Sequence, residues 1–183
     1  MSTHKGKIGI GMAVLFMVCS TMTVAQNSAD LTARISCPGI ASAGQELGKT
    51  IQVTVKNLGQ VTAARFAVDL VLSTDTAVPV KYASYSANFQ EDCLLQGGRE
   101  HEFNLAGGET RIVTLNGNNR IPADTPPGTY YLAAVIDAGD EVSESNERNN
   151  VVLCRLKIGE ELKQTITPVL RPHVVTHLKV PVP

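Results

Sequence analysis

The stretch GTYYLAAVID, residues 128–137, says most about the fold of this 183-residue chain. Its successive side chains alternate between two sets that are both apolar or aromatic, which is the period of two of a β-strand. Bulk on both sides is typical of a strand that is covered on both faces. A Pro126-Pro127-Gly128 turn signal precedes it. The sequence therefore predicts a central strand over residues 130–136.

Six more short segments show the same period and end at Gly, Pro, Asn or Ser signals. They are residues 31–37, 51–56, 65–72, 101–105, 113–115 and 152–158. No window beyond the N-terminal region has a helical period, so nothing could form the crossover helices of a parallel sheet. We expect an all-β fold, an immunoglobulin-like sandwich of seven antiparallel strands. Residues 76–96 lack either period and form a long connection, a type that is often functional.

The N-terminal residues have the pattern of a secretory signal peptide. Basic side chains at Lys5 and Lys7 precede an apolar run over residues 8–18, and small and polar residues follow up to Ala25. The run is shorter than the roughly 20 residues of a membrane-spanning helix. We expect a signal peptide helix over residues 1–25 that is cleaved after Ala25, and an exported protein without a stable membrane span. Its location would be secreted, at the cell surface or in the periplasm.

The remaining chain divides into a leader at 26–29, a sandwich at 30–159 and an extended, Pro- and Val-rich tail at 160–183. Its length suits one domain of ordinary size. Cleavage would remove two of the 16 basic side chains and none of the 17 acidic ones. A net negative chain carries no electrostatic footprint for nucleic acid, and we expect no nucleic-acid partner.

Four segments resemble one family. They are Asp30-Leu31, VTVKNLG at 53–59, GTYYLAAVID at 128–137 and ESNERNN at 144–150. In this order they look like a CARDB domain, the cell-adhesion-related domain of bacteria, over residues 30–159. The most specific feature is the pairing of the last two segments. The resemblance implies a seven-stranded immunoglobulin-like sandwich in secreted or surface proteins, usually as an accessory module beside other domains. Here we expect the module itself to carry the function.

An acidic and amide-rich stretch follows the central strand. Oxygen ligands are available from Asp137, Asp140, Glu144, Asn146 and Glu147. Oxygen ligands suit calcium, but their spacing differs from the twelve-residue calcium loop. The alternative is that these side chains bond backbone groups of a tight hairpin. No other cofactor is expected.

Three residues are interpreted as structural. Asn149 and Asn150 end the acidic stretch, where amide side chains often bond turns. Tyr130 opens its strand after a Pro-Gly corner, where a buried ring with one bonded hydroxyl is common in sandwiches.

Partner-binding candidates lie in two segments. Tyr82, Tyr85 and Phe89 belong to the long connection, where exposed aromatic rings supply contact area at low entropic cost. A cluster that only holds the connection in place is the alternative. Val174 and Val175 belong to the tail, which could add a strand to the edge of a sheet.

Three cysteines remain after cleavage, at positions 37, 93 and 154. An oxidising compartment favours one disulfide and leaves one thiol. If the strands run up and down in order, the end of the first lies at the same end of the sandwich as the entry to the fourth. This arrangement predicts a Cys37–Cys93 bond with Cys154 as the spare thiol.

The sequence offers little for catalysis. His101 is the one histidine in the body of the domain, and no nucleophile elbow, paired-histidine zinc motif or phosphate loop is present. We therefore expect a non-catalytic, extracytoplasmic cell-adhesion-type module that binds a protein or a surface glycan through loops or a sheet edge. Two alternatives stay open: an assembly subunit that oligomerises or docks through residues 160–183, and a calcium-binding accessory domain.

Overall fold

The structure, a computed structural model, describes residues 27–159. Within them lie eight strands and a single turn of 3₁₀ helix, η1. Their bounds are β1 Leu31–Ser36, β2 Ile40–Ser42, η1 Gly48–Thr50, β3 Gln52–Asn57, β4 Ala63–Ser73, β5 Cys93–Leu105, β6 Thr110–Ile112, β7 Gly128–Ile136 and β8 Val151–Gly159. No helix in this range is long and apolar enough to cross a membrane. The predicted signal peptide and the tail with Val174 and Val175 lie outside the described residues.

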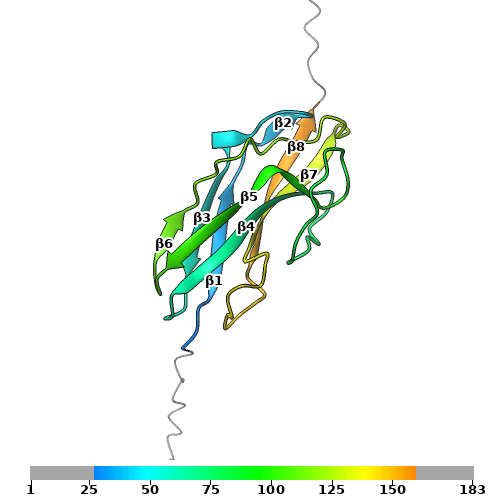
Figure 1. Cartoon of the computed structure of the whole chain (residues 1–183). Coiled ribbons are helices and arrows are strands. Elements are labelled where there is room, and N and C mark those ends of the chain that lie inside the picture. Colours follow the sequence, from blue (N-terminus) through cyan, green and yellow to red (C-terminus); the bar gives the residue numbers. More distant parts are fainter. Residues whose placement is uncertain (1–26, 160–183) are drawn as a thin grey trace, which may run out of the picture.

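The strands form two sheets that face each other (Figure 1). One has three strands in the order β1-β3-β6, and the other has five in the order β2-β8-β7-β4-β5. All neighbours are antiparallel except β2, which pairs in parallel with β8. The all-β sandwich is confirmed. Strand β7 lies between β8 and β4, as the apolar side chains on both of its faces predict.

The main core lies between the sheets. Alternate side chains of each strand point inward, which is why period two dominates the sequence. Among the fully buried ones are Leu31 and Val53 of the three-stranded sheet and Phe66, Leu132 and Leu156 of the five-stranded sheet. Their burial from both sheets supplies the main apolar stabilisation of the domain.

A smaller core covers the other face of the five-stranded sheet. Ala133 and Val135 of β7 pack there with Val71 of β4 and with Val78 and Ala83 of the connection between β4 and β5. The connection thus covers the outer apolar face of β7. This explains both the apolar residues on two sides of 130–136 and the lack of a period in the connection.

Three strand predictions differ from the structure. Strand β2 was not predicted because three residues are too few to show a period. Strand β5 begins at Cys93, inside the segment expected to be a connection, and Gly97, with φ +73°, lies near an irregularity in its register with β4. A strand predicted at 113–115 is wrong, because β6 ends at Ile112 and Val113 packs on the core from irregular backbone. Eight strands are therefore present in place of seven.

The predicted Cys37–Cys93 disulfide is also wrong. Cys37 is bonded to Cys154, with the Cα atoms 6.3 Å apart, and Cys93 is a buried free thiol. After β1 the chain passes to β2, which lies beside β8, so Cys37 arrives next to the strand that carries Cys154. Cys93 opens β5, three places from β8 in the same sheet. The up-and-down order assumed for the strands does not hold.

Candidate functional site

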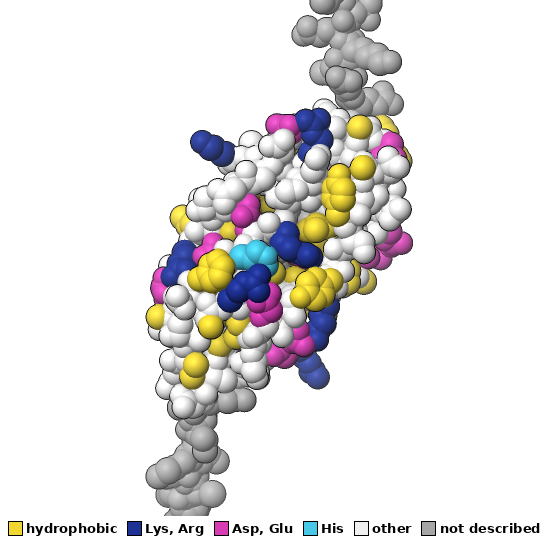
Figure 2. Space-filling model, viewed as in Figure 1, with side chains coloured by type: hydrophobic (Ala, Val, Ile, Leu, Met, Phe, Trp, Pro, Cys, Tyr) yellow, Lys and Arg dark blue, Asp and Glu magenta, His cyan; other side chains and the backbone are white. Residues whose placement is uncertain are grey.

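The outer face of β4 and β5 carries exposed aromatic and basic side chains. Arg99, His101 and Phe103 alternate along β5 and therefore project on one face, opposite Asp69, Ala67 and Arg65 of β4. Figure 2 shows a histidine among basic and hydrophobic side chains over these strands. We call Arg65, Tyr82, Arg99, His101 and Phe103 the aromatic–basic face.

An ion pair with a buried carboxylate lies at the centre of this face. The Asp69 carboxylate is fully buried and accepts hydrogen bonds from Nε and Nη2 of Arg99 at 2.7 and 2.5 Å. Such two-point pairing sets the plane of the guanidinium. The hydrogen bond to Asp69 raises the pKa of Arg99, which stays positively charged. Its central carbon lies 5.2 Å from the ring centroid of Tyr82, within cation–π distance.

Tyr82 is held from two sides while 57% of its surface stays exposed. Its backbone φ is +37°, which is uncommon for a bulky residue, and its N–H donates to the carbonyl of Ala138 at 3.2 Å. The hydroxyl lies over Gly139, where a Cβ would come within 2.8 Å of it. The ring is thus placed by β5 on one side and by the β7–β8 connection on the other.

Arg65 joins the same face to the β7–β8 connection. Its Nη1 donates to a carboxylate oxygen of Glu141 at 2.6 Å, and its Nη2 lies 3.3 Å from the His101 ring. Phe103 is 53% exposed beside it. In residues 27–159, Arg65 is the one side chain hydrogen-bonded to His101, so no hydroxyl or thiol is placed for activation by the imidazole. The arrangement can stack, donate hydrogen bonds and attract negative charge.

The structure separates the three aromatic residues predicted in the long connection. Tyr82 lies in the aromatic–basic face. Tyr85 is 52% exposed but lines a different hollow, with Arg120. Phe89 packs edge-on against Tyr130, with ring centroids 5.4 Å apart, and contacts the main core. No local pattern groups Tyr82 with the β5 residues, although the place of Phe103 on a period-two strand was an available signal for an exposed ring.

The residues expected to be structural make specific hydrogen bonds. The Tyr130 hydroxyl donates to the carbonyl of Pro126 at 2.8 Å. Asn149 donates to the Asp30 carboxylate at 2.8 Å, and Asn150 donates to Glu144 at 2.9 Å. The Asn149–Asp30 bond joins the β7–β8 connection to the residue before β1.

The acidic stretch bonds mainly to backbone. The Asp137 carboxylate accepts the N–H groups of Glu141 and Val142, both at 2.9 Å. Glu144 accepts the N–H of Leu31, and burial raises its pKa to about 7. Burial also raises the pKa of Asp137.

Two further side chains of the stretch also accept backbone N–H groups. Glu147 accepts that of Glu144 at 3.0 Å, and Asn146 accepts that of Arg148 at 3.2 Å. These carboxylate and amide groups bond turns, which was the alternative to calcium binding.

A cation is already present beside these acids. The Lys81 ammonium pairs with Asp140, and this hydrogen bond together with the nearby charges of Glu147 and Asp137 raises the pKa of Lys81. Within the part of the chain that the structure describes, no three His, Cys, Asp or Glu side chains are grouped to hold a metal ion. The residues present here do not fit a calcium site.

Comparison with known proteins gives one family. The model of the CARDB family matches residues 28–153. No curated protein matches the chain by sequence.

The chain is similar to several solved structures. The crystal structure of a CARDB domain from Pyrococcus furiosus, in complex with di-metal ions, has a TM-score of 0.51 at 23% identity and covers 74% of this chain and 97% of that one. The solution structure of the CARDB domain from the same Pyrococcus protein has a TM-score of 0.48 at 21% identity, covering 72% and 96%. A β-glucosidase from Listeria innocua has a TM-score of 0.41 at 15% identity, covering 72% of this chain and 16% of the enzyme.

Proposed function

Because the chain belongs to the CARDB family, we propose that it is a non-catalytic, adhesion-type module that binds a protein partner outside the cytoplasm. The proposed contact surface is the aromatic–basic face. Action outside the cytoplasm rests on the signal pattern of residues 1–25.

One observation carries the proposal: Tyr82 and Phe103 are each more than half exposed and lie on one face with arginines. Tyr, Phe and Arg are enriched at protein interfaces, and Tyr and Arg dominate their binding energy. A surface ring normally loses rotamer freedom on binding. Tyr82 is already held by Arg99 and by the β7–β8 connection, so its ordering cost is reduced.

The charge of the face indicates the character of the partner. Arg99 is neutralised by Asp69 and Arg65 by Glu141, so the face carries donors without a large net charge. This balance favours a partner surface with apolar groups and hydrogen-bond acceptors over a polyanion. A glycan with neutral sugar rings is the competing ligand, since rings also stack on sugars.

The test compares single variants in partner capture. The protein without residues 1–25 is immobilised and exposed to extracellular and cell-surface fractions, and a captured protein is purified and titrated. We expect Tyr82→Ala and Phe103→Ala each to weaken binding about tenfold or more. Tyr85→Ala is the matched control, because it removes an equally exposed ring outside the face. Equal affinity of all three variants and wild type would contradict the proposal, and capture of neutral glycan alone would reassign the ligand.

A further inference from the structure

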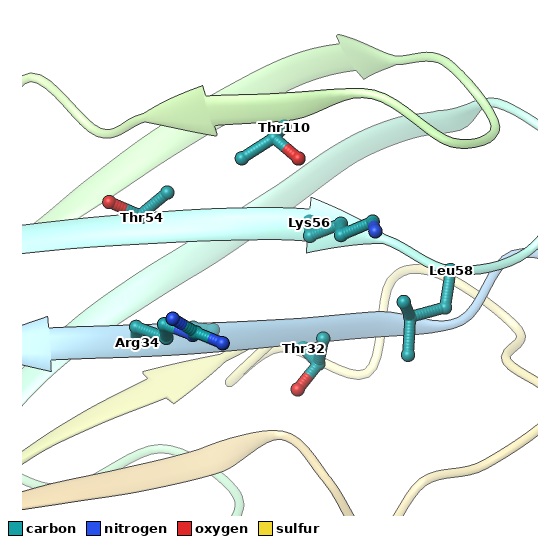
Figure 3. A pocket seen from close by; sticks show the side chains of 7 residues that line it. Thr32, Arg34, Thr54, Lys56, Leu58 and Thr110 are labelled. Atoms are coloured by element: carbon teal, nitrogen blue, oxygen red, sulfur yellow. The ribbon is translucent and has the colours of Figure 1, made fainter.

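A second polar surface lies on the opposite side of the sandwich. The outer face of the three-stranded sheet contains a groove of about 480 Å³. Side chains of β1 and β3, together with Thr110 of β6 and Leu58 after β3, line it (Figure 3). The groove shares no residue with the aromatic–basic face.

The strand register explains this lining. Val53 and Val55 point into the core, so Thr54 and Lys56 point outward from the middle strand. On β1, Thr32 lies directly opposite Lys56, and Arg34 lies opposite Thr54. The two cations are therefore diagonal neighbours on adjacent strands, about 7–8 Å apart at the backbone.

The groove is lined by basic side chains and by no acidic ones. Its lining residues include Arg34 and Lys56 and no carboxylate. Neither cation forms an ion pair within residues 27–159, whereas five other basic side chains there do: Arg65, Lys81, Arg99, Arg111 and Arg120. Lys49, Arg148, Arg155 and Lys157 are also unpaired in these residues, so what distinguishes the groove is that two cations share one hollow without a carboxylate.

The acids nearest in sequence are bonded elsewhere. Asp30 accepts a hydrogen bond from Asn149. Glu109 accepts the N–H of Ala106 and pairs with Arg111, and the bond to Ala106 is the main cause that lowers its pKa. Neither carboxylate lines the groove.

We infer that this groove binds an acidic glycan, a sugar polymer that carries carboxylate or sulfate groups. Arg34 and Lys56 can each meet one anionic group, and their diagonal spacing suits a repeated charge better than a single small ion. The hydroxyls of Thr32, Thr54 and Thr110 stand between and beside the cations as donors and acceptors for sugar hydroxyls. Leu58, 52% exposed at one end, offers an apolar contact for a sugar ring.

The inference can be tested on the protein without residues 1–25. Oligogalacturonate supplies carboxylate groups, and its methyl ester is the neutral counterpart. Dextran sulfate supplies sulfate groups, and dextran is the neutral counterpart. Calorimetry at low salt should detect binding of at least one charged polymer and none of its neutral counterpart. Because counterions are released, affinity should fall as salt is raised.

Two double variants decide whether the groove is responsible. Arg34→Gln with Lys56→Gln should weaken binding about tenfold or more, because charged hydrogen bonds are lost. Arg155→Gln with Lys157→Gln is the matched control: it makes the same charge change on two exposed side chains that also lie close together, two residues apart on β8. Equal losses in both double variants would show attraction to net charge and overturn the groove assignment. Tighter binding of single-stranded DNA than of either polymer, or no binding of either polymer, would overturn the glycan.

Loss of this activity is separable from failure of the proposed protein contact. Tyr82→Ala and Phe103→Ala should leave polymer binding unchanged, and the Arg34 and Lys56 variants should leave partner capture unchanged.

Discussion

Replacement of Glu144 by glutamine should change how stability depends on pH. Glu144 lies in the β7–β8 connection and accepts hydrogen bonds from the Leu31 N–H and from Asn150. Burial is the largest cause that raises its pKa from 4.5 to about 7, and the charges of Glu147 and Asp137 add to the rise. Within the folded protein this carboxyl therefore holds its proton at a pH where the unfolded chain has released it.

The sign and size of the effect follow from this difference. Between about pH 4.5 and pH 7 the folded state binds more protons than the unfolded state, so the free energy of unfolding falls as pH rises. Each pKa unit corresponds to about 1.4 kcal/mol, and the rise from 4.5 to about 7 sets an upper limit of about 3 kcal/mol. The contribution is complete below about pH 4.5 and is lost above about pH 7.

The Glu144→Gln substitution removes the titrating carboxyl group and keeps a side chain of nearly the same shape. One amide oxygen can still accept the Leu31 N–H. The new amide nitrogen can donate to Oδ1 of Asn150, an atom that is buried without a partner, if the Asn150 amide turns over. We expect the variant to gain on wild type by up to about 3 kcal/mol between pH 5 and pH 8.

Urea unfolding at pH 5, 6, 7 and 8 measures this change, with Glu91→Gln as an exposed control that should follow wild type. Asp137, whose pKa burial also raises, leaves a smaller slope of the same sign in the variant. If wild type and Glu144→Gln lost the same stability over this range, the argument from burial would be refuted.

Three further predictions concern the disulfide, a buried asparagine and calcium. Replacing Cys37 and Cys154 by serine should cost about 2–5 kcal/mol in urea unfolding, because the bond closes a loop of 117 residues, and peptide mapping should find no bond to Cys93. Asn57→Ala should cost about 3 kcal/mol or more, since this buried side chain bonds four backbone groups near two turns; a loss under 1 kcal/mol would contradict it. Calcium should produce neither heat nor a rise in Tm, because the Asp137 oxygens bond backbone N–H groups and Lys81 already neutralises Asp140; saturable heat would contradict this.

The strands that the sequence predicted correctly are those with alternating side chains. Side-chain period two depends on local backbone geometry, so β1, β3, β4, β7 and β8 were found within a few residues of their bounds. Strand β7 was also placed centrally, because its second apolar face has to be covered. The segment that covers it could not be recognised, since Val78 and Ala83 pack from irregular backbone without any period.

The residues of the site could not be grouped from the sequence, because strand pairing brings them together and local patterns do not show it. Arg65 of β4 lies on one face with Arg99, His101 and Phe103 of β5 only because the two strands pair in one register. Tyr82 reaches this face from the connection before β5, through its contact with Arg99. The Asp69–Arg99 pair is likewise set by that register. The disulfide prediction was wrong for the same reason. Which cysteines meet depends on which strands are neighbours, and β2, with three residues, is too short for its parallel pairing with β8 to show in the sequence.

The two proposed surfaces lie on opposite sheets, and the packed core between them decides how they interact. Sheets in a sandwich stand about 10 Å apart, a distance at which substitutions without shared partners usually act additively. Arg34 and Lys56 share no hydrogen-bond partner with Tyr82 or Phe103, and the Cys37–Cys154 bond joins the chain after β1 to β8. A module of this kind can therefore hold a glycan on one face and a protein on the other without competition. Binding of the glycan polymer should accordingly leave the affinity for the protein partner unchanged, which is the behaviour expected of a rigid connector between two surfaces.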